Sequence, residues 1–210
     1  IWLPGDGGAD AELPRYRDVL RQGWFMVFIG GRFVAGLVAV GFDAVLALYL
    51  LSLGLPRWSA TVFFLVMCVL IALAAQMVRQ LSGLVGQLRL LIGATIILAA
   101  GYLVFIGLTG VHGTTSLVLV LGLGLILLSL ATAISTALAS NVMLRFAPAT
   151  SSGRHASLFQ TAWTLASTLA PGIYARLFTV DRTLPWGFSA VLLVVSAAAY
   201  AAVHRSRPGR

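Results

Sequence analysis

Residues 24–55 of this chain read WFMVFIGGRFVAGLVAVGFDAVLALYLLSLGL, an almost unbroken apolar run whose only charged side chains are Arg32 and Asp43. A helix needs about 20 predominantly apolar residues to cross the hydrocarbon core of a bilayer. Further runs meet or nearly meet that length at residues 60–78, 88–108, 115–144, 156–178 and 186–203. The sequence therefore predicts an all-α integral membrane protein, with six transmembrane helices in one domain over residues 23–205.

The arginines fall almost entirely into alternate gaps between these runs. The side that includes the N-terminal segment collects Arg15, Arg17, Arg21, Arg79, Arg89, Arg145, Arg154, Arg205, Arg207 and Arg210, whereas the opposite side holds Arg57, Arg176 and Arg182. Basic residues accumulate on the cytoplasmic side of a membrane protein. We therefore expect a multi-pass protein of a bacterial plasma membrane with both termini in the cytoplasm, where residues 206–210 form a basic tail.

Composition narrows the class of partner. Hydrophobic residues make up 60% of the chain and charged residues 10%, whereas an ordinary soluble domain carries about 25% charged residues. The net charge is +8, but nucleic-acid-binding proteins gather basic residues on one face or stripe. Here they are spread over several short segments, so the expected partner is the lipid bilayer, and no nucleic acid.

Residues that could support enzyme or metal chemistry are sparse. The single cysteine, Cys68, lies within an apolar run, and the histidines (His112, His155 and His204) are far apart in the sequence. No HExxH pattern or other metal-ligand spacing is present. We expect no enzymatic activity, no metal and no cofactor.

The N-terminal 22 residues differ from the rest of the chain. Residues 1–4 are apolar, and residues 5–12 are acidic and rich in glycine. This pattern is typical of a membrane span that ends in a linker, so we expect residues 1–22 to be a cytoplasmic linker in a longer protein. A short interfacial helix fits residues 13–22, because their charges would face headgroups and water.

A charged residue within a membrane span is costly and is a functional candidate by default. Arg32 and Asp43 are eleven positions apart, which places them on one helical face but about 16 Å apart along the axis. They are too far apart for a salt bridge, so each needs another partner. Asp43 could carry a proton during transport or be a hydrogen-bonded structural acid; Arg32 could act in transport or extend toward the headgroups.

Other polar side chains within the spans are candidates for a substrate cavity. Ser129, Thr132 and Thr136, followed by Ser140, recur every three or four residues along one face of the fourth span. This face either lines a cavity or bonds to a neighbouring helix. The remaining candidates are Gln76 in the second span and Gln160 and Trp163 in the fifth. For Trp163, helix packing is the favoured explanation over a place in a cavity.

Three stretches resemble the C-terminal six-helix half of a major facilitator superfamily transporter. Residues 43–65 (DAVLALYLLSLGLPRWSATVFFL) are similar to the end of the seventh helix, the outer turn and the start of the eighth in that family. Residues 79–93 (RQLSGLVGQLRLLIG) resemble the cytoplasmic turn between the eighth and ninth helices, with matches at Leu81, Gly86, Arg89 and Gly93. Residues 148–177 (PATSSGRHASLFQTAWTLASTLAPGIYARL) resemble the loop before the eleventh helix and that helix.

The resemblance implies secondary transport of a small organic solute, with proton-coupled efflux the expected form. It also implies a second, N-terminal six-helix half, in the same longer chain or in another subunit, because substrate binds between the two halves of such transporters. The first, second, fourth and fifth spans would then line the cavity. The alternative is a non-transporting six-helix membrane subunit or a truncated, inactive transporter fragment.

Overall fold

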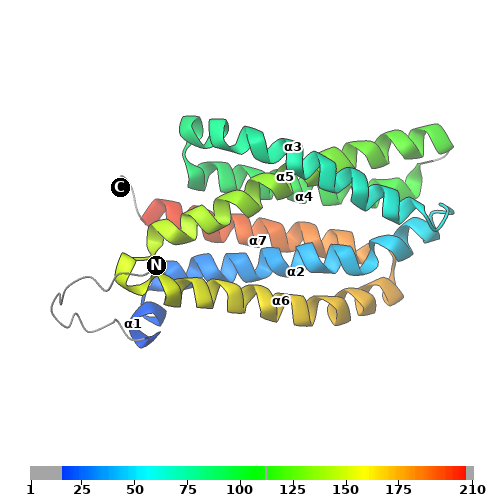
Figure 1. Ribbon diagram of the computed structural model, residues 1–210. Helices are drawn as coiled ribbons and strands as arrows, with labels where there is room; N and C mark the ends of the chain where they lie inside the picture. Colours follow the sequence, from blue (N-terminus) through cyan, green and yellow to red (C-terminus); the bar gives the residue numbers. More distant parts are fainter. Residues whose placement is uncertain (1–15, 112, 207–210) are drawn as a thin grey trace, which may run out of the picture.

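The computed structural model describes residues 16–111 and 113–206, and all regular secondary structure in these ranges is helical (Figure 1). A short helix, α1 (Tyr16–Leu20), precedes the bundle. The long helices are α2 (Gly23–Ser52), α3 (Ser59–Val85), α4 (Gln87–Gly107), α5 (Thr114–Phe146), α6 (Ser152–Val180) and α7 (Leu184–Ser206). Single 3-10 turns, η1 (Leu108–Gly110) and η2 (Ala149–Ser151), follow α4 and precede α6. The predicted linker at residues 1–15 and tail at residues 207–210 lie outside the described residues.

Each predicted span coincides with one long helix. Five of these helices, α2, α3, α4, α5 and α7, are long and apolar enough to cross a membrane. The sixth, α6, is equally long but is the least apolar of the set. The all-helical class is therefore confirmed, five helices are candidate membrane spans by their length and composition, and the sixth span stays a prediction.

The sequence leaves a gap between the apolar runs at residues 60–78 and 88–108, which predicts a turn at residues 79–87, and this turn is wrong in extent. Helix α3 continues through this polar segment as far as Val85, and the break before α4 is confined to Gly86. Gly86 has φ +81°, a backbone conformation that side chains with a Cβ rarely adopt. Helix α3 runs on to Val85 because a helix satisfies its backbone hydrogen bonds within itself, whether or not it lies in a hydrocarbon core.

The six long helices pack as two groups of three, and each group combines helices from both halves of the sequence. In sequence, the first three long helices are α2, α3 and α4, and the last three are α5, α6 and α7. In space, α2 packs mainly on α6 and α7, whereas α5 packs mainly on α3 and α4. Figure 1 shows these groups as two layers, joined by the α4–α7 contact. The first helix of each sequence triplet thus packs on the second and third helices of the other triplet.

Aromatic side chains fill the core between the two groups. Phe42 of α2 meets Tyr102 and Phe105 of α4 and Trp186 of α7 edge to face, at ring-centroid distances of 5.7, 5.8 and 5.9 Å. Tyr49 donates its hydroxyl proton to the carbonyl of Phe105. A second cluster, nearer the start of α2, joins Phe28 to Tyr200 of α7 at 5.5 Å. These two clusters hold α2 against α4 and α7.

Candidate functional site

Arg32 lies between α2 and α6 with its guanidinium carbon over two aromatic rings. That carbon is 4.6 Å from the ring centroid of Trp163 and 5.1 Å from that of Phe159. Its Nε atom is buried and has no hydrogen-bond partner. The helices approach closely here because Gly36, one turn along α2, faces Ala166 and Trp163. Arg32 is thus held by ring contacts with α6, and it forms no ion pair or hydrogen bond with a described residue.

Asp43 occupies a different surface, since its side chain is exposed on the outside of the bundle. Its exposed neighbours on the same stretch of α2 include Ala44, Ala47, Leu48 and Leu51. No hydrogen bond or ion pair joins Asp43 to a described residue. A lone carboxylate on an apolar surface costs roughly 2.5–3.5 kcal/mol at the centre of a membrane helix. At the centre of a bilayer, this stretch of α2 would therefore require water or a polar partner beyond these six helices.

Helix α6 has one buried stripe and a broad polar side. The stripe consists of His155, Phe159, Ala162, Ala166, Ala170 and Tyr174. On the opposite side lies the α6 hydroxyl row, which we define as Ser157, Thr161, Thr164 and Thr168, all exposed. Each hydroxyl donates to a backbone carbonyl three or four residues earlier, at 2.8 to 3.1 Å. The hydroxyl row explains why α6 is less apolar than the other long helices.

Two predicted cavity residues, Gln160 and Trp163, lie on the flank of α6 between its buried stripe and the hydroxyl row. Gln160 is exposed, and Trp163 is half-buried beneath Arg32. Ser167, one turn further, donates its hydroxyl proton to the Trp163 carbonyl at 2.9 Å. The structure therefore brings Arg32 and Trp163 together and places Gln160 one turn away from that contact.

The candidate residues of the fourth predicted span, helix α5, do not share one environment. Ser129 is buried, and its Oγ donates to the Leu125 carbonyl of the same helix at 2.7 Å. Thr132 is half-buried, whereas Thr136 and Ser140 are exposed. Gln76, near the end of α3, is also exposed. Among the described residues, Arg32 contacts the rings of α6 and neither Gln76 nor these α5 residues.

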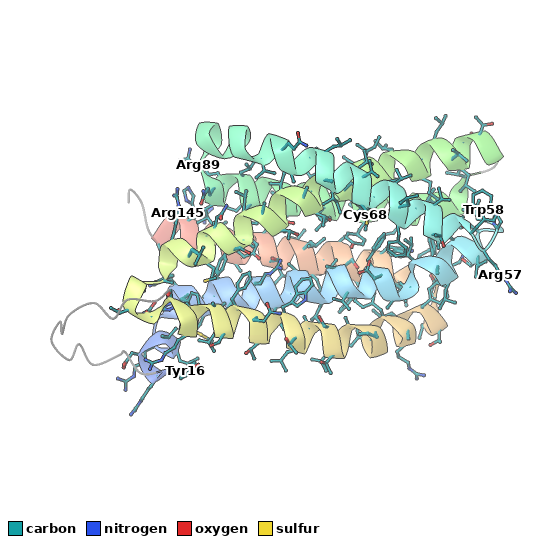
Figure 2. The ribbon with its side chains drawn as sticks, in the orientation of Figure 1. Tyr16, Arg57, Trp58, Cys68, Arg89 and Arg145 are labelled. Atoms are coloured by element: carbon teal, nitrogen blue, oxygen red, sulfur yellow. The ribbon has the colours of Figure 1, made fainter. Side chains whose placement is uncertain are left out.

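The cytoplasmic-turn candidates Gly86 and Arg89 lie at the junction of α3 and α4. Gly86 forms the break itself, and the exposed Arg89 donates from Nε to Nε2 of His204, at the end of α7, over 3.3 Å. Figure 2 shows Arg89 and Arg145 at one end of the bundle and Arg57 at the other. This arrangement has the charge asymmetry expected of a protein in which one end faces the cytoplasm.

At the same end, α1 is attached to the start of α6. His155 is fully buried; its Nδ1 lies 3.0 Å from the Ser151 carbonyl and its Nε2 lies 3.4 Å from Oε1 of Gln22. The guanidinium of Arg154 lies 5.4 Å from the ring centroid of Tyr16. The predicted interfacial helix at residues 13–22 therefore corresponds to α1, which is ordered by contacts with α6.

At the opposite end, the turn between α6 and α7 contains a carboxylate with a defined role. Asp181 accepts hydrogen bonds at Oδ1 from the hydroxyl and the backbone amide of Thr183, both at 2.6 Å. These bonds favour the charged form, so they lower the pKa of Asp181 below its ordinary value. Asp181 thereby fixes the turn that leads into α7.

Sequence reasoning missed two features of this region. Phe159 completes the aromatic contact with Arg32, and its position four residues before Trp163 would have placed both rings on one helical face. The α6 hydroxyl row was also missed, although its spacing of four, three and four residues is the same signal that identified the row in the fourth span.

Within the ranges that the structure describes, no group of three or more His, Cys, Asp or Glu side chains could hold a metal ion. The free cysteine, Cys68, is exposed on α3. Comparisons of the chain with protein-family models, with curated proteins and with solved structures found no match.

Proposed function

We propose that this chain is one six-helix half of a major facilitator-type secondary transporter, which exports a small organic solute in exchange for protons. In this proposal α6 is the sixth span, and both termini face the cytoplasm of a bacterial cell. The role is transport and not catalysis. Asp43 binds and releases the coupling proton, and the face of α2 that carries it lines the cavity between two halves.

The exposure of Asp43 carries the proposal. An acid that faced lipid would be strongly disfavoured at this position, whereas an acid that faces a water-filled cavity has a solvent and a proton source. The exposed residues around it are small or apolar, as the wall of a solute pathway requires. A second six-helix unit that covers this face leaves Asp43 in contact with water and substrate.

The exchanged helix triplets give independent support. Three is an odd number, so the second triplet begins on the membrane side opposite to the first. Two triplets that pack reciprocally in this way have the arrangement of inverted repeats, in which substrate sites lie near the middle of the bilayer. The resemblance of residues 43–65, 79–93 and 148–177 to the transporter family points in the same direction.

Helix α6 fits this arrangement better than it fits a lipid-facing position. Its hydroxyl row and Gln160 give it a polar side, which faces the cavity and the N-terminal half in the proposed assembly. The leucines on its other flank, including Leu165 and Leu169, then face lipid. This orientation accounts for a span that is less apolar than its neighbours.

The direct test is solute-driven proton movement. The protein, with any six-helix unit that copurifies with it, is reconstituted into vesicles that contain a pH-sensitive dye, and a panel of small organic solutes is added. We expect at least one solute to move protons in the unmodified protein and none to do so in Asp43→Asn. The matched control is Asp181→Asn, an exposed acid in the outer turn, which should retain full flux.

Two outcomes would contradict parts of this proposal. Proton-coupled flux that is unchanged in Asp43→Asn would remove Asp43 from the coupling role. Absence of flux for every solute would favour the second interpretation, a non-transporting membrane subunit or an inactive fragment. The orientation of the protein in the membrane is tested with Arg57→Cys in a Cys68→Ser background, by adding a thiol label outside whole cells. Labelling only after cell lysis would mean that the end of the bundle with position 57 faces the cytoplasm.

A further inference from the structure

The positive charge of the Arg32 guanidinium is not neutralised by a carboxylate, although it lies well inside the apolar run of α2. It lies level with residues 159–163 of α6, so it is roughly 7–14 Å further along that helix than Arg154. The carboxylates among the described residues belong to Asp18, Asp43 and Asp181, and none of them forms an ion pair with Arg32. Among the described residues, Arg32 thus has a buried Nε–H without an acceptor and no carboxylate to neutralise its charge.

The ring contacts of Arg32 leave its hydrogen-bonding edge unused. A guanidinium stacks on aromatic rings through its flat face, whereas its five N–H groups point outward in the plane. The guanidinium carbon lies over the rings of Phe159 and Trp163, and the buried Nε–H has no acceptor among the described residues. Because the Arg32 side chain is only half-buried, its outer N–H groups are available to a two-oxygen anionic group.

A neighbouring polar side chain extends this site. Gln160 lies on the same flank of α6 as Trp163, three residues earlier, and its amide is exposed. A helical spacing of three residues places side chains next to each other. A ligand that extends from Arg32 along this flank, past Trp163, would meet the Gln160 amide one turn away, which offers a hydrogen-bond donor or acceptor to the part of the ligand that carries no charge.

We infer that Arg32 anchors an organic monoanion, a carboxylate with an apolar or aromatic body, and that Gln160 contacts the same ligand. A monoanion is favoured because one guanidinium neutralises one negative charge, whereas a dianion would keep a net charge inside the membrane. The inference rests on the proposed transport function only in that it names the class of solute. A carboxylate side chain of the second half is the competing anion.

Binding to the purified protein in detergent tests this inference without any transport step. The probes are benzoate and its uncharged counterpart benzamide, and the measurement is the midpoint of thermal unfolding against probe concentration. We expect benzoate to raise the midpoint saturably, because a ligand that binds the folded state stabilises it, and benzamide to have no effect. In Arg32→Gln the affinity for benzoate should fall by at least about tenfold, the loss expected for charge-assisted hydrogen bonds.

Two further variants keep the test decisive. Arg32→Lys retains the charge but loses the planar guanidinium, so its affinity for benzoate should lie between those of the unmodified protein and Arg32→Gln. This variant also provides the test if Arg32→Gln does not fold. Arg176→Gln removes an exposed arginine from the other end of α6 and should bind benzoate as the unmodified protein does. Benzoate binding that is absent, or equal in Arg32→Gln, would overturn the inference.

The outcome is separable from that of the transport experiment. Arg32-dependent benzoate binding without any solute-driven flux would support the anion site and remove the transport function. Flux that persists in Arg32→Gln, together with no benzoate binding, would leave the transport function standing and assign the Arg32 charge to a carboxylate of the second half.

Discussion

Replacement of Gly41 by alanine should separate α2 from α6, because the ring of Tyr174 lies directly against the glycine. A Cβ at position 41 would be 2.3 Å from Cδ2 and Cε2 of that ring and 2.4 Å from Cζ. Carbon atoms in contact are about 3.5 Å apart, so the ring would have to retreat by about 1.2 Å. Tyr174 is fully buried, and its hydroxyl lies 2.7 Å from Oγ of Ser189, a hydrogen bond that this movement would break.

The expected magnitude follows from these terms. Overpacking of a filled interior costs about 1–3 kcal/mol, and the lost hydrogen bond adds about 0.6 kcal/mol within a membrane. The change from glycine to alanine in a helix returns about 1 kcal/mol. We expect Gly41→Ala to lower the free energy of unfolding by about 0.6–2.6 kcal/mol, measured by circular dichroism as the fraction of SDS in mixed micelles is raised.

Gly30 on the same helix provides the matched control. A Cβ at Gly30 would meet nothing within 4 Å, so Gly30→Ala should raise the free energy of unfolding by about 0.5–1 kcal/mol. If both variants had the same stability, the close approach of α2 and α6 at Tyr174 would be refuted. The aromatic contact that holds Arg32 depends on the same pair of helices, so Gly41→Ala should also weaken benzoate binding.

Two further predictions concern the ends of the bundle. Gly86→Ala should lower the free energy of unfolding by about 1–3 kcal/mol, because φ at this position is +81°. Gly153→Ala, which adds a Cβ in open space within α6, is the control in the same SDS titration. Equal losses of stability in the two variants would contradict the backbone argument. The Asp181 carboxyl should titrate below its ordinary pKa because Thr183 hydrogen-bonds its charged form, and carboxyl-carbon NMR should show a higher midpoint in Thr183→Val. Since the folded-state pKa is the lower one, the stabilisation from Asp181 is present above the unfolded-state pKa and is lost as pH falls through the folded-state pKa. An unchanged midpoint in Thr183→Val would contradict this assignment.

The helices could be predicted from the sequence because their signals are local. Long apolar runs require no knowledge of neighbours, and the turn at Gly54 and Pro56 stops α2 within a few residues of the predicted end. The boundary between α3 and α4 is predicted wrongly because a polar segment in the sequence indicates a turn, whereas the helix continues through it. A polar segment outside the hydrocarbon core is free to remain helical, and only Gly86 has a conformation that ends the helix.

The candidate site was predictable only in part, because its geometry depends on contacts between distant residues. The charges at Arg32 and Asp43 stand out in any apolar run, and both were identified. Their shared helical face did not reveal that Arg32 lies under α6 while Asp43 is exposed. Likewise, the spacing from Ser129 to Thr136 predicts that these residues share a face of one helix. It does not predict that a neighbouring helix covers Ser129 and leaves Thr136 exposed.

The exchanged triplets have a consequence for how the protein is made. Of these six helices, α2 is synthesised first, yet the helices that pack on it, α6 and α7, are synthesised after the other three. Until then the clefts at Gly31 and Gly41, later occupied by Tyr200 and Tyr174, have no side chain to receive. Arg32 likewise has no ring contact with Phe159 and Trp163 until α6 has been synthesised. The packing of α2 is therefore completed only after α6 and α7 have been synthesised, so the order of synthesis differs from the order of packing.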